Sequence, residues 1–442
     1  PFYLFQVLKQ LLNIRVILKG LLYAGVMFVL FIPMLQDYTE YKTYIAPLNG
    51  SFETEKDTAF NWPDWWEGSY QEQKNRYLKD NFGLHNYYVR LNSQLNFNLF
   101  KKANAAYVVV GKDNYLYETG YIDAYHGKDF IGTQKVETYM RQLKQVQDTL
   151  AAHNKLLLVV FAAGKASFYP EYIPDHLRKM PSLSNYHAFR AMAARYNINH
   201  IDFNKYFIEQ KNKSPYPLYP QYGIHWSNYG SIMAFDSMVK YTEHKLQRDL
   251  PDVELPSVEL SDSLRHTDND IIKGMNLLWE PPSFKMAYPT FNVRNDSTKH
   301  RPSMLVIADS FWWHIYSTNL PAAVFSNHQF WYYNEAIYPQ SFTAPMNVKD
   351  TDYKNNIRSF DVIVLLHTES TLARFGDGFV EMCYEALVDD AKRKNEIEHL
   401  RHTIRSDVSW YKQVQEKAAT KGISADSMLT LDAIYVLDQK KP

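Results

Sequence analysis

The stretch MLVIADSF at residues 304–311 runs from a continuous apolar segment directly into an acid and a serine. Five apolar residues in a row, Met304 to Ala308, predict a strand that is buried on both faces, as in a parallel sheet. Open α/β sheets place their functional groups at the carboxyl ends of such strands. Ser310 therefore stands where a reactive side chain is expected. The structural alternative is that Asp-Ser only caps the helix that follows.

A second short motif, YGIHWS at residues 222–227, lies about 85 residues before Ser310. Its histidine, His225, stands just before a helix predicted to begin at Ser227. The positive end of that helix favours a neutral imidazole that can act as a base. A serine and a histidine together indicate an acyl-transfer site, so we predict Ser310 as nucleophile and His225 as base. The alternative for His225 is a structural histidine in the core.

A histidine base needs a partner that orients its ring, and the residues just before His225 do not supply a carboxylate. Gly223 and Tyr222 stand there instead. Glu369 follows the apolar run DVIVLL (361–366), which predicts a strand ending at the same edge of the sheet as Ser310. We predict Glu369 as the candidate acid, with a solvent-facing or structural glutamate as the alternative. We also expect substrate contacts from Asp309, Lys165, Trp226 and Tyr222.

Strand patterns alternate with helical patterns over residues 106–442, which predicts an α/β domain with a parallel sheet flanked by helices. LLLVVF (156–161) predicts another buried strand, and Thr133 is expected to cap a helix that runs to about His153 and has one apolar face. Further elements are expected as a hairpin at 107–117, a helix capped by Ser184, and a short strand at 201–203. Residues 250–302 are rich in Pro, Asp and Ser, and predict an insertion or long loops.

The amino-terminal part predicts a membrane anchor. Residues 20–35 carry no charge, and extension to Val16 gives twenty residues interrupted only by Lys19, enough to span a bilayer. Basic residues precede this stretch and acidic residues follow it first, which predicts a cytoplasmic amino terminus. We expect a cytoplasmic segment and anchor at 1–40, followed by a linker and helical arm at 41–105. A cleaved signal peptide is the alternative.

Composition narrows the function classes. The 442 residues are 46% hydrophobic, and Lys+Arg and Asp+Glu both number 48, so nothing indicates nucleic-acid binding. The one cysteine, Cys383, cannot form an internal disulfide and is expected to be a small buried residue. We predict no metal and no cofactor, because metal-ligand motifs and Gly-rich phosphate loops are absent from the sequence. The 34 Tyr and 9 Trp suit ordinary packing or sugar recognition.

With these residues the chain resembles the alginate O-acetyltransferase AlgJ/AlgX-like proteins, which have an SGNH-hydrolase-like domain. The resemblance spans roughly residues 75–375. It rests on the amino-terminal membrane segment, the VVGKDNYLY block at 109–117, Lys165 with Tyr169-Pro170, the His225-Trp226 motif and the Asp309-Ser310-Phe311 motif, in this order. The family pattern is Asp-x-His-Trp, so Gly223 occupies the position of the usual triad acid.

The resemblance implies a bacterial, Gram-negative protein of the inner membrane with its main domain in the periplasm. It implies acetyl transfer to a polysaccharide acceptor, beside a multi-span membrane-bound O-acyltransferase and a lipid bilayer. It assigns Ser310 as nucleophile and His225 as base. Two alternatives stay open. One is a glycan O-acetyl esterase, and the other is a non-catalytic glycan-binding or scaffold subunit. The loss of the acid at Gly223 favours the non-catalytic subunit.

Overall fold

The computed structural model describes residues 14–39, 46–50, 56–180, 182–294 and 298–439. The predicted cytoplasmic segment therefore lies largely outside the described residues. The chain divides into two compact units. The first contains the described residues of Pro1–Tyr117, Gln221–Gly223 and Asn269–Ser283, and the second contains those of Glu118–Pro220, Ile224–Asp268 and Phe284–Pro442. The domain boundaries expected from the sequence stay a prediction.

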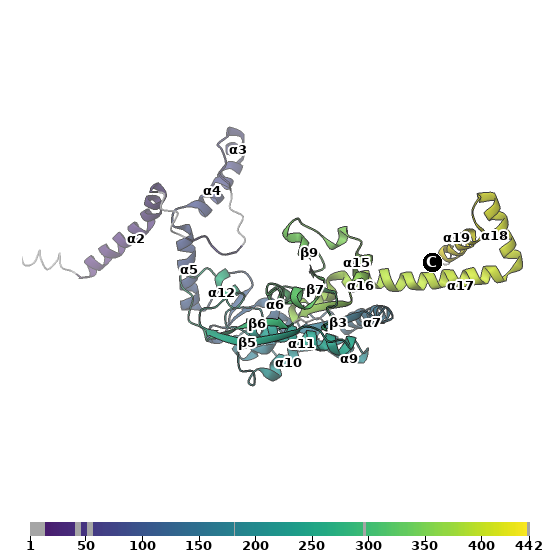
Figure 1. The fold of residues 1–442 in the computed structure, drawn as a ribbon. Coiled ribbons are helices and arrows are strands. Elements are labelled where there is room, and N and C mark those ends of the chain that lie inside the picture. Colours follow the sequence, from purple (N-terminus) through teal and green to yellow (C-terminus); the bar gives the residue numbers. More distant parts are fainter. Residues whose placement is uncertain (1–13, 40–45, 51–55, 181, 295–297, 440–442) are drawn as a thin grey trace, which may run out of the picture. The chain divides into compact units, whose positions relative to one another are not determined.

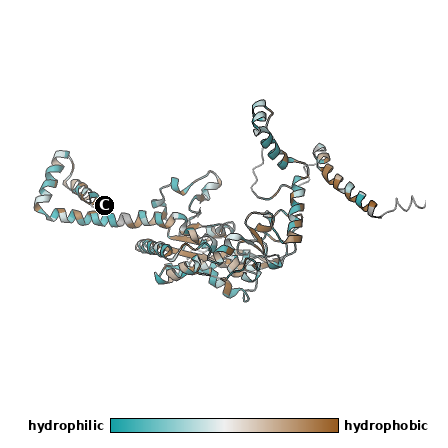
Figure 2. Cartoon of the chain, turned by 180° about the vertical axis from the view of Figure 1, so that it is seen from behind, coloured by the Kyte–Doolittle hydropathy of each residue, from teal (hydrophilic) through white to brown (hydrophobic). Residues whose placement is uncertain are grey.

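The first unit is mainly helical and begins with the apolar helix α2 (Ile14–Tyr38). Within it, Val16–Gln36 has the length and composition of a membrane anchor or of a signal sequence, and Figure 2 shows this helix coloured mostly as hydrophobic. The predicted hairpin is confirmed, because β1 and β2 pair as a two-stranded sheet. The remaining elements begin or lie in this unit: α3 (Trp62–Glu67), α4 (Ser69–Asn81), α5 (His85–Phe100), β1 (Val108–Val110), η2 (Lys112–Asn114), β2 (Leu116–Glu118) and α12 (Asp270–Gly274).

The second unit is built on a six-stranded sheet in its described residues, with the order β4-β3-β10-β7-β8-β9. The first five strands of this order run parallel, and β9 pairs antiparallel with β8. The strands are β3 (Leu156–Ala162), β4 (His200–Asp202), β7 (Met304–Ala308), β8 (His328–Tyr332), β9 (Ala336–Tyr338) and β10 (Val362–Thr368). This confirms the predicted α/β class, and it places the carboxyl ends of β3, β7 and β10 at one edge.

Helices cover the sheet (Figure 1). The helices and helical turns up to the last strand are α6 (Thr119–Tyr125), α7 (Thr133–Ala151), α8 (Lys165–Phe168), η3 (Pro170–Tyr172), α9 (Asn185–Arg195), α10 (Phe203–Gln210), α11 (Asn228–Leu246), α13 (Phe311–Tyr316), α14 (Leu320–Val324), η4 (Gln340–Phe342), η5 (Val348–Asp350) and α15 (Tyr353–Ser359). After β10 follow η6 (Glu369–Gly378), α16 (Phe379–Cys383), η7 (Tyr384–Asp389), α17 (Asp390–Ser406), α18 (Val408–Lys421) and α19 (Ala425–Gln439).

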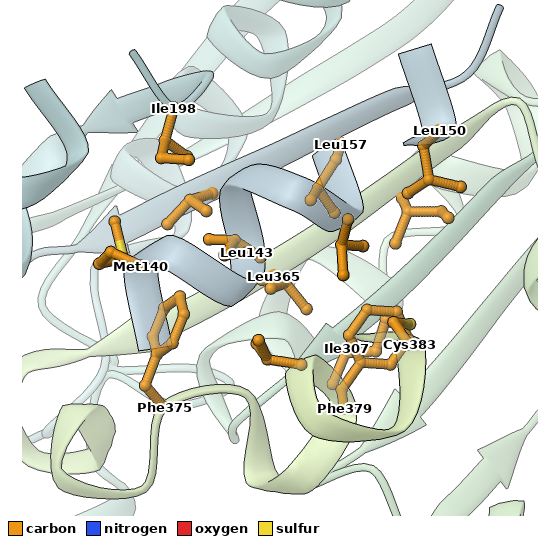
Figure 3. Packing of buried hydrophobic residues seen from close by; sticks show 14 of the residues in the cluster. Met140, Leu143, Leu150, Leu157, Ile198, Ile307, Leu365, Phe375, Phe379 and Cys383 are labelled. Carbon is orange, nitrogen blue, oxygen red and sulfur yellow. The ribbon is translucent and has the colours of Figure 1, made fainter. Parts of the chain in front are cut away.

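The core lies where α7 and α9 pack on one face of the sheet. Met140, Leu143 and Leu150 recur at helical spacing on α7 and are buried against Leu157 of β3, as Figure 3 shows. Cys383 is fully buried in the same cluster, which confirms the expectation of a small apolar side chain. The last three helices pack around a separate apolar cluster: Ile404, Val414, Ala418, Met428, Leu429 and Ala433.

The expectation of loops in 250–302 is wrong for two long strands. β5 (Asp252–Ser261) and β6 (Met286–Arg294) form an antiparallel ribbon. The register shifts between Glu254 and Ser257, where Pro256 interrupts the pairing. Proline cannot donate a ladder hydrogen bond and is tolerated at bulges and edges. The two prolines of this ribbon hid its strands from pattern reading.

Candidate functional site

Ser310 lies at the centre of the carboxyl edge of the sheet. Its strand, β7, runs between β10 and β8, and α13 begins immediately after the serine. The Ser310 side chain makes no capping hydrogen bond to α13, so the capping alternative is wrong for this residue. Its Oγ atom instead lies 3.0 Å from Nε2 of His225. The two residues predicted from motifs 85 positions apart are therefore in hydrogen-bond contact.

The loop that carries His225 is held by the cap of α11. Ser227 is the N-cap, and its Oγ accepts a hydrogen bond from the N–H of Gly230 at 2.9 Å while donating to the carbonyl of Pro217 at 2.7 Å. The ring of Phe311, next to the serine, lies 4.8 Å from the His225 ring. For Nε2 to accept the serine proton, the proton of the neutral ring must reside on Nδ1; this tautomer is assigned from the hydrogen bond.

Asp309, directly before the serine, is buried and accepts four hydrogen bonds. Its Oδ1 accepts from the N–H of Phe311 at 3.0 Å. Its Oδ2 accepts from the N–H and the hydroxyl of Thr368 and from the hydroxyl of Thr371, each at 2.8 Å. These bonds tie the turn after β7 to the end of β10. The structure thus shows Asp309 holding the backbone that presents Ser310, and its predicted contact with substrate stays a prediction.

His367 extends this network into the core. Its Nε2 accepts from the N–H of Gly376 at 3.0 Å, so its Nδ1 carries the proton and donates to the Thr371 hydroxyl at 3.2 Å. Burial lowers the pKa of His367 to about 4, with the nearby Asp309 charge acting in the opposite direction. The imidazole is therefore neutral at physiological pH and completes a chain of hydrogen bonds that ends on the Asp309 carboxylate.

Glu369 is also buried at this edge, but it has different partners. Its Oε2 accepts from the Ser167 hydroxyl at 2.6 Å, and its Oε1 accepts from the side-chain amide of Asn204. Burial raises its pKa to about 7, an effect that the two hydrogen bonds only partly offset. A Cβ atom at Gly164 would clash with Oε2 of Glu369, so a larger residue there would force the Glu369 side chain to shift. The role of Glu369 as the triad acid stays a prediction.

The other predicted substrate residues are buried. Trp226 is fully buried, with its ring 5.3 Å from that of Phe311, and Lys165 is fully buried at the start of α8. Tyr222 belongs to the first unit, where its buried side chain donates a hydrogen bond to the carbonyl of Pro282 at 2.9 Å. These positions favour packing roles, and substrate contact by these residues stays a prediction. Among the described residues, no group of three or more His, Cys, Asp or Glu side chains could hold a metal ion.

Sequence reasoning missed the groups that support the site. Phe311 enters the sequence prediction only as part of a motif, although its ring packs against the His225 ring. Thr368, Thr371 and His367 were not singled out, although they determine the surroundings of Asp309. The signal available was the polar sequence HTEST (367–371) immediately after a fully buried strand, a position where polar side chains must find partners.

Comparison with known proteins places this site in a wider context. Residues 108–263 match the family model described as the SGNH hydrolase-like domain of the acetyltransferase AlgX. The matched segment contains His225 and Lys165 and ends before Ser310. No curated protein sequence matches the chain.

Three solved structures are among those similar to this chain. The O-acetyltransferase domain of Pseudomonas putida AlgJ has 16% identity and a TM-score of 0.41, covering 63% of this chain and 99% of that chain. Pseudomonas aeruginosa AlgX has 12% identity and a TM-score of 0.39, covering 62% and 67%. Bacillus cereus PatB1 with a sulfonyl adduct has 11% identity and a TM-score of 0.37, covering 56% and 93%.

Proposed function

We propose that this protein transfers an acetyl group through Ser310 and His225, because residues 108–263 match the SGNH hydrolase-like domain of the acetyltransferase AlgX. The observation that carries the proposal is the 3.0 Å contact between Ser310 Oγ and His225 Nε2. A serine hydroxyl is a weak nucleophile until a base within hydrogen-bond reach takes its proton. The half-buried position of the pair at the edge of the sheet leaves it within reach of a substrate.

The reaction takes place in two balanced halves. First, Ser310 Oγ attacks the carbonyl carbon of the acetyl donor while His225 Nε2 accepts the serine proton. Collapse of the tetrahedral intermediate leaves acetyl-serine, and His225 returns the proton to the departing group. In the second half, His225 takes the proton of an acceptor hydroxyl, which attacks the acetyl-serine. The acetyl ester forms on the acceptor, and the proton returns to Ser310.

The surroundings of Ser310 supply orientation for these steps. Asp309 accepts the N–H of Phe311 and the donors on Thr368 and Thr371, so the turn that presents Ser310 has little freedom. We assign the backbone N–H of Ser310, at the start of α13, as a donor to the developing oxyanion. The ring of Phe311 restricts rotation of His225.

We further propose that the acceptor is a hydroxyl of an exported polysaccharide and that the protein works at the bacterial inner membrane. The apolar helix α2 supports an anchor, and the basic residues before it with the acidic residues after it support a cytoplasmic amino terminus and a periplasmic main domain. A multi-span membrane-bound O-acyltransferase is the proposed source of the acetyl group. A reporter enzyme fused after residue 442 tests the topology, because activity restricted to the cytoplasm contradicts it.

A scaffold role is the second candidate, and Gly223 at the position of the family acid favours it. The two functions are separated by trapping the acetyl-enzyme. We expect incubation with p-nitrophenyl acetate to add one acetyl group to a peptide containing Ser310, detected by mass spectrometry. His225→Ala should slow this labelling strongly. The matched control is Ser370→Ala, at another half-buried serine that follows an acid at a strand end, and it should label normally. Absence of labelling in the wild-type protein would support the scaffold.

A further inference from the structure

Beside Ser310 lies a group of aromatic side chains that the proposed chemistry does not use. We name it the aromatic wall, and it consists of Trp313, Tyr332, Tyr333, Tyr338 and Phe342. Trp313 follows Ser310 by three residues, so the two lie one helical turn apart on α13. β8 pairs with β7 so that Tyr332 is opposite Ala308, and the N–H of Tyr333 donates to the Ala308 carbonyl at 3.0 Å. The wall therefore begins next to the turn that presents the nucleophile.

The rings support one another. The Trp313 ring centre lies 5.6 Å from that of Tyr332, 4.6 Å from that of Tyr338 and 6.1 Å from that of Phe342. The rings of Tyr332 and Tyr333 lie 4.4 Å apart. The guanidinium of Arg374 lies 4.3 Å from the Tyr333 ring centre and forms an ion pair with Asp377 at 3.1 Å. Rings held in this way lose little freedom when a ligand binds, which favours a recognition surface.

The side chains of the aromatic wall are partly exposed to solvent, whereas neighbouring tryptophans are buried in the core. Trp312 and Trp331 precede wall residues in the chain and are fully buried, and their rings pack in the core on Phe235 and Phe379, respectively. The wall side chains, in contrast, are half-buried, except for Phe342, which is 66% exposed. Aromatic rings that stay in contact with water on a connected surface mark an interaction site more often than isolated exposed residues do.

We infer that the aromatic wall is the subsite that stacks sugar rings of the acceptor chain next to Ser310, an inference that rests on the proposed function. An acceptor hydroxyl must approach acetyl-serine from solvent, and the wall lies one helical turn away along the α13 side of this approach. Flat rings match the apolar faces of sugars, and tyrosine hydroxyls and an exposed arginine can bond to sugar hydroxyls. The surface therefore fits a sugar chain, with its reacting ring nearest Tyr332 and the next rings over Trp313 and Phe342.

The test compares two acetyl acceptors on the same enzyme. Water is the acceptor in p-nitrophenyl acetate hydrolysis. The second acceptor is a set of oligosaccharides prepared from the host's surface polysaccharide by base de-acetylation and partial acid hydrolysis. The variants are Phe342→Ala and Trp313→Leu. The matched control is Tyr435→Ala on α19, because Tyr435 is also 66% exposed and lies far along the chain from the wall.

We expect each wall variant to raise the KM for oligosaccharide and to lower the ratio of transfer to hydrolysis by about tenfold, as loss of one aromatic contact implies. The Tyr435→Ala control should change neither quantity. An unchanged ratio in both wall variants would overturn the inference. Phe342→Ala keeps the test valid if Trp313→Leu fails to fold, because Phe342 is mostly exposed.

Failure of the inference and failure of the proposed function give different results. If Ser310→Ala hydrolyses p-nitrophenyl acetate like the wild type, the Ser/His chemistry is wrong. Binding of the same oligosaccharides to Ser310→Ala protein, measured by calorimetry, then tests the wall without chemistry. We expect Phe342→Ala in this background to weaken binding by about tenfold. Equal affinity with and without the Phe342 ring contradicts the wall as a sugar site.

Discussion

The strands β7 and β10 are each followed by an acid and a serine, and the two acid-serine pairs lie in different surroundings. β7 is followed by Asp309-Ser310, and its neighbour β10 ends at Thr368 and is followed by Glu369-Ser370. Both acids are buried and both serines are half-buried. Only Ser310 is in contact with a histidine, through the loop before α11. The Ser370 hydroxyl instead lies 3.2 Å from that of Thr368.

The two acids differ in the number of donors that reach them. Asp309 accepts four hydrogen bonds, two of them from backbone N–H groups, so both of its buried side-chain oxygens have donors. Glu369 accepts one bond from Ser167 and one from Asn204, and burial raises its pKa to about 7. An acid and a serine at a strand end therefore do not define a site. The difference between the two strand ends comes from the hydrogen-bond donors and the histidine that other segments place beside them.

The largest difference in acetyl-transfer rate is expected between variants of the two serines. Ser310→Ala should lower acetyl transfer by at least about 10³-fold, because the nucleophile is lost. Ser370→Ala should leave the rate within about twofold, since the contact described for its hydroxyl is with Thr368 and not with a base. Initial rates with p-nitrophenyl acetate measure both. Equal losses in the two variants would contradict the assignment of the nucleophile.

Next in size is Asp309→Asn. The amide would place N–H donors where Thr368 and Thr371 already donate, leaving buried groups unpaired. We expect the free energy of unfolding to fall by about 3 kcal/mol. Urea denaturation of the purified protein measures the loss. A change below about 0.5 kcal/mol would mean that the four hydrogen bonds do not stabilise the turn.

Glu369→Gln tests the difference between the two acids through the pH dependence of the free energy of unfolding. The folded pKa of Glu369 is about 7 and its ordinary value is 4.5, so the unfolded chain loses this proton first as pH rises. The folded state is therefore progressively destabilised between these two values, by about 3 kcal/mol in all. Glu369→Gln should remove this part of the loss, seen as a smaller decrease in unfolding free energy from about pH 5 to about pH 8. Identical pH dependence in the two proteins would argue against the raised pKa.

The same variant tests the predicted triad acid. An orienting acid lost by substitution lowers turnover by orders of magnitude. We expect Glu369→Gln to lower acetyl transfer less than about tenfold, because both carboxylate oxygens already accept hydrogen bonds from Ser167 and Asn204. A loss of about 10³-fold or more would instead assign Glu369 to the catalytic site.

The smallest effect is expected for Thr371→Val, which removes one hydroxyl at nearly constant volume. That hydroxyl donates to Asp309 and accepts from His367. We expect the unfolding free energy to fall by about 1 kcal/mol, with the loss measured by urea denaturation. Thr318→Val serves as the control, because the Thr318 hydroxyl is hydrogen-bonded to the nearby backbone of Ile315 and Leu320 in the described part of the chain. A larger loss of unfolding free energy for Thr318→Val than for Thr371→Val would mean that the hydrogen bonds between Asp309, Thr371 and His367 do not stabilise the fold more than an ordinary backbone contact does.

Local patterns determined much of this protein. The runs 156–161 and 304–308 lie in buried strands, as a short unbroken apolar sequence indicates for a strand covered on both faces of a parallel sheet. The face of α7 followed from helical spacing, and Ser184 and Ser227 cap the helices that they were expected to begin. The β5–β6 ribbon could not be read in this way, because its prolines interrupt the alternation on which strand prediction depends.

In the candidate site, too, some features could be predicted from local sequence patterns and others could not. Ser310 and His225 were predictable because each follows or precedes an element with a clear local signal. The partners of the acids were not, because Glu369 meets Ser167 and Asn204 across sequence separations of 202 and 165 residues. Pairing of that kind depends on strand order and register, which no local pattern contains. The sequence by itself determined the buried strands and predicted that Ser310 and His225 act as a pair. Only the tertiary structure decided which donors surround each buried acid, and so which acid accepts four hydrogen bonds and which has its pKa raised by burial.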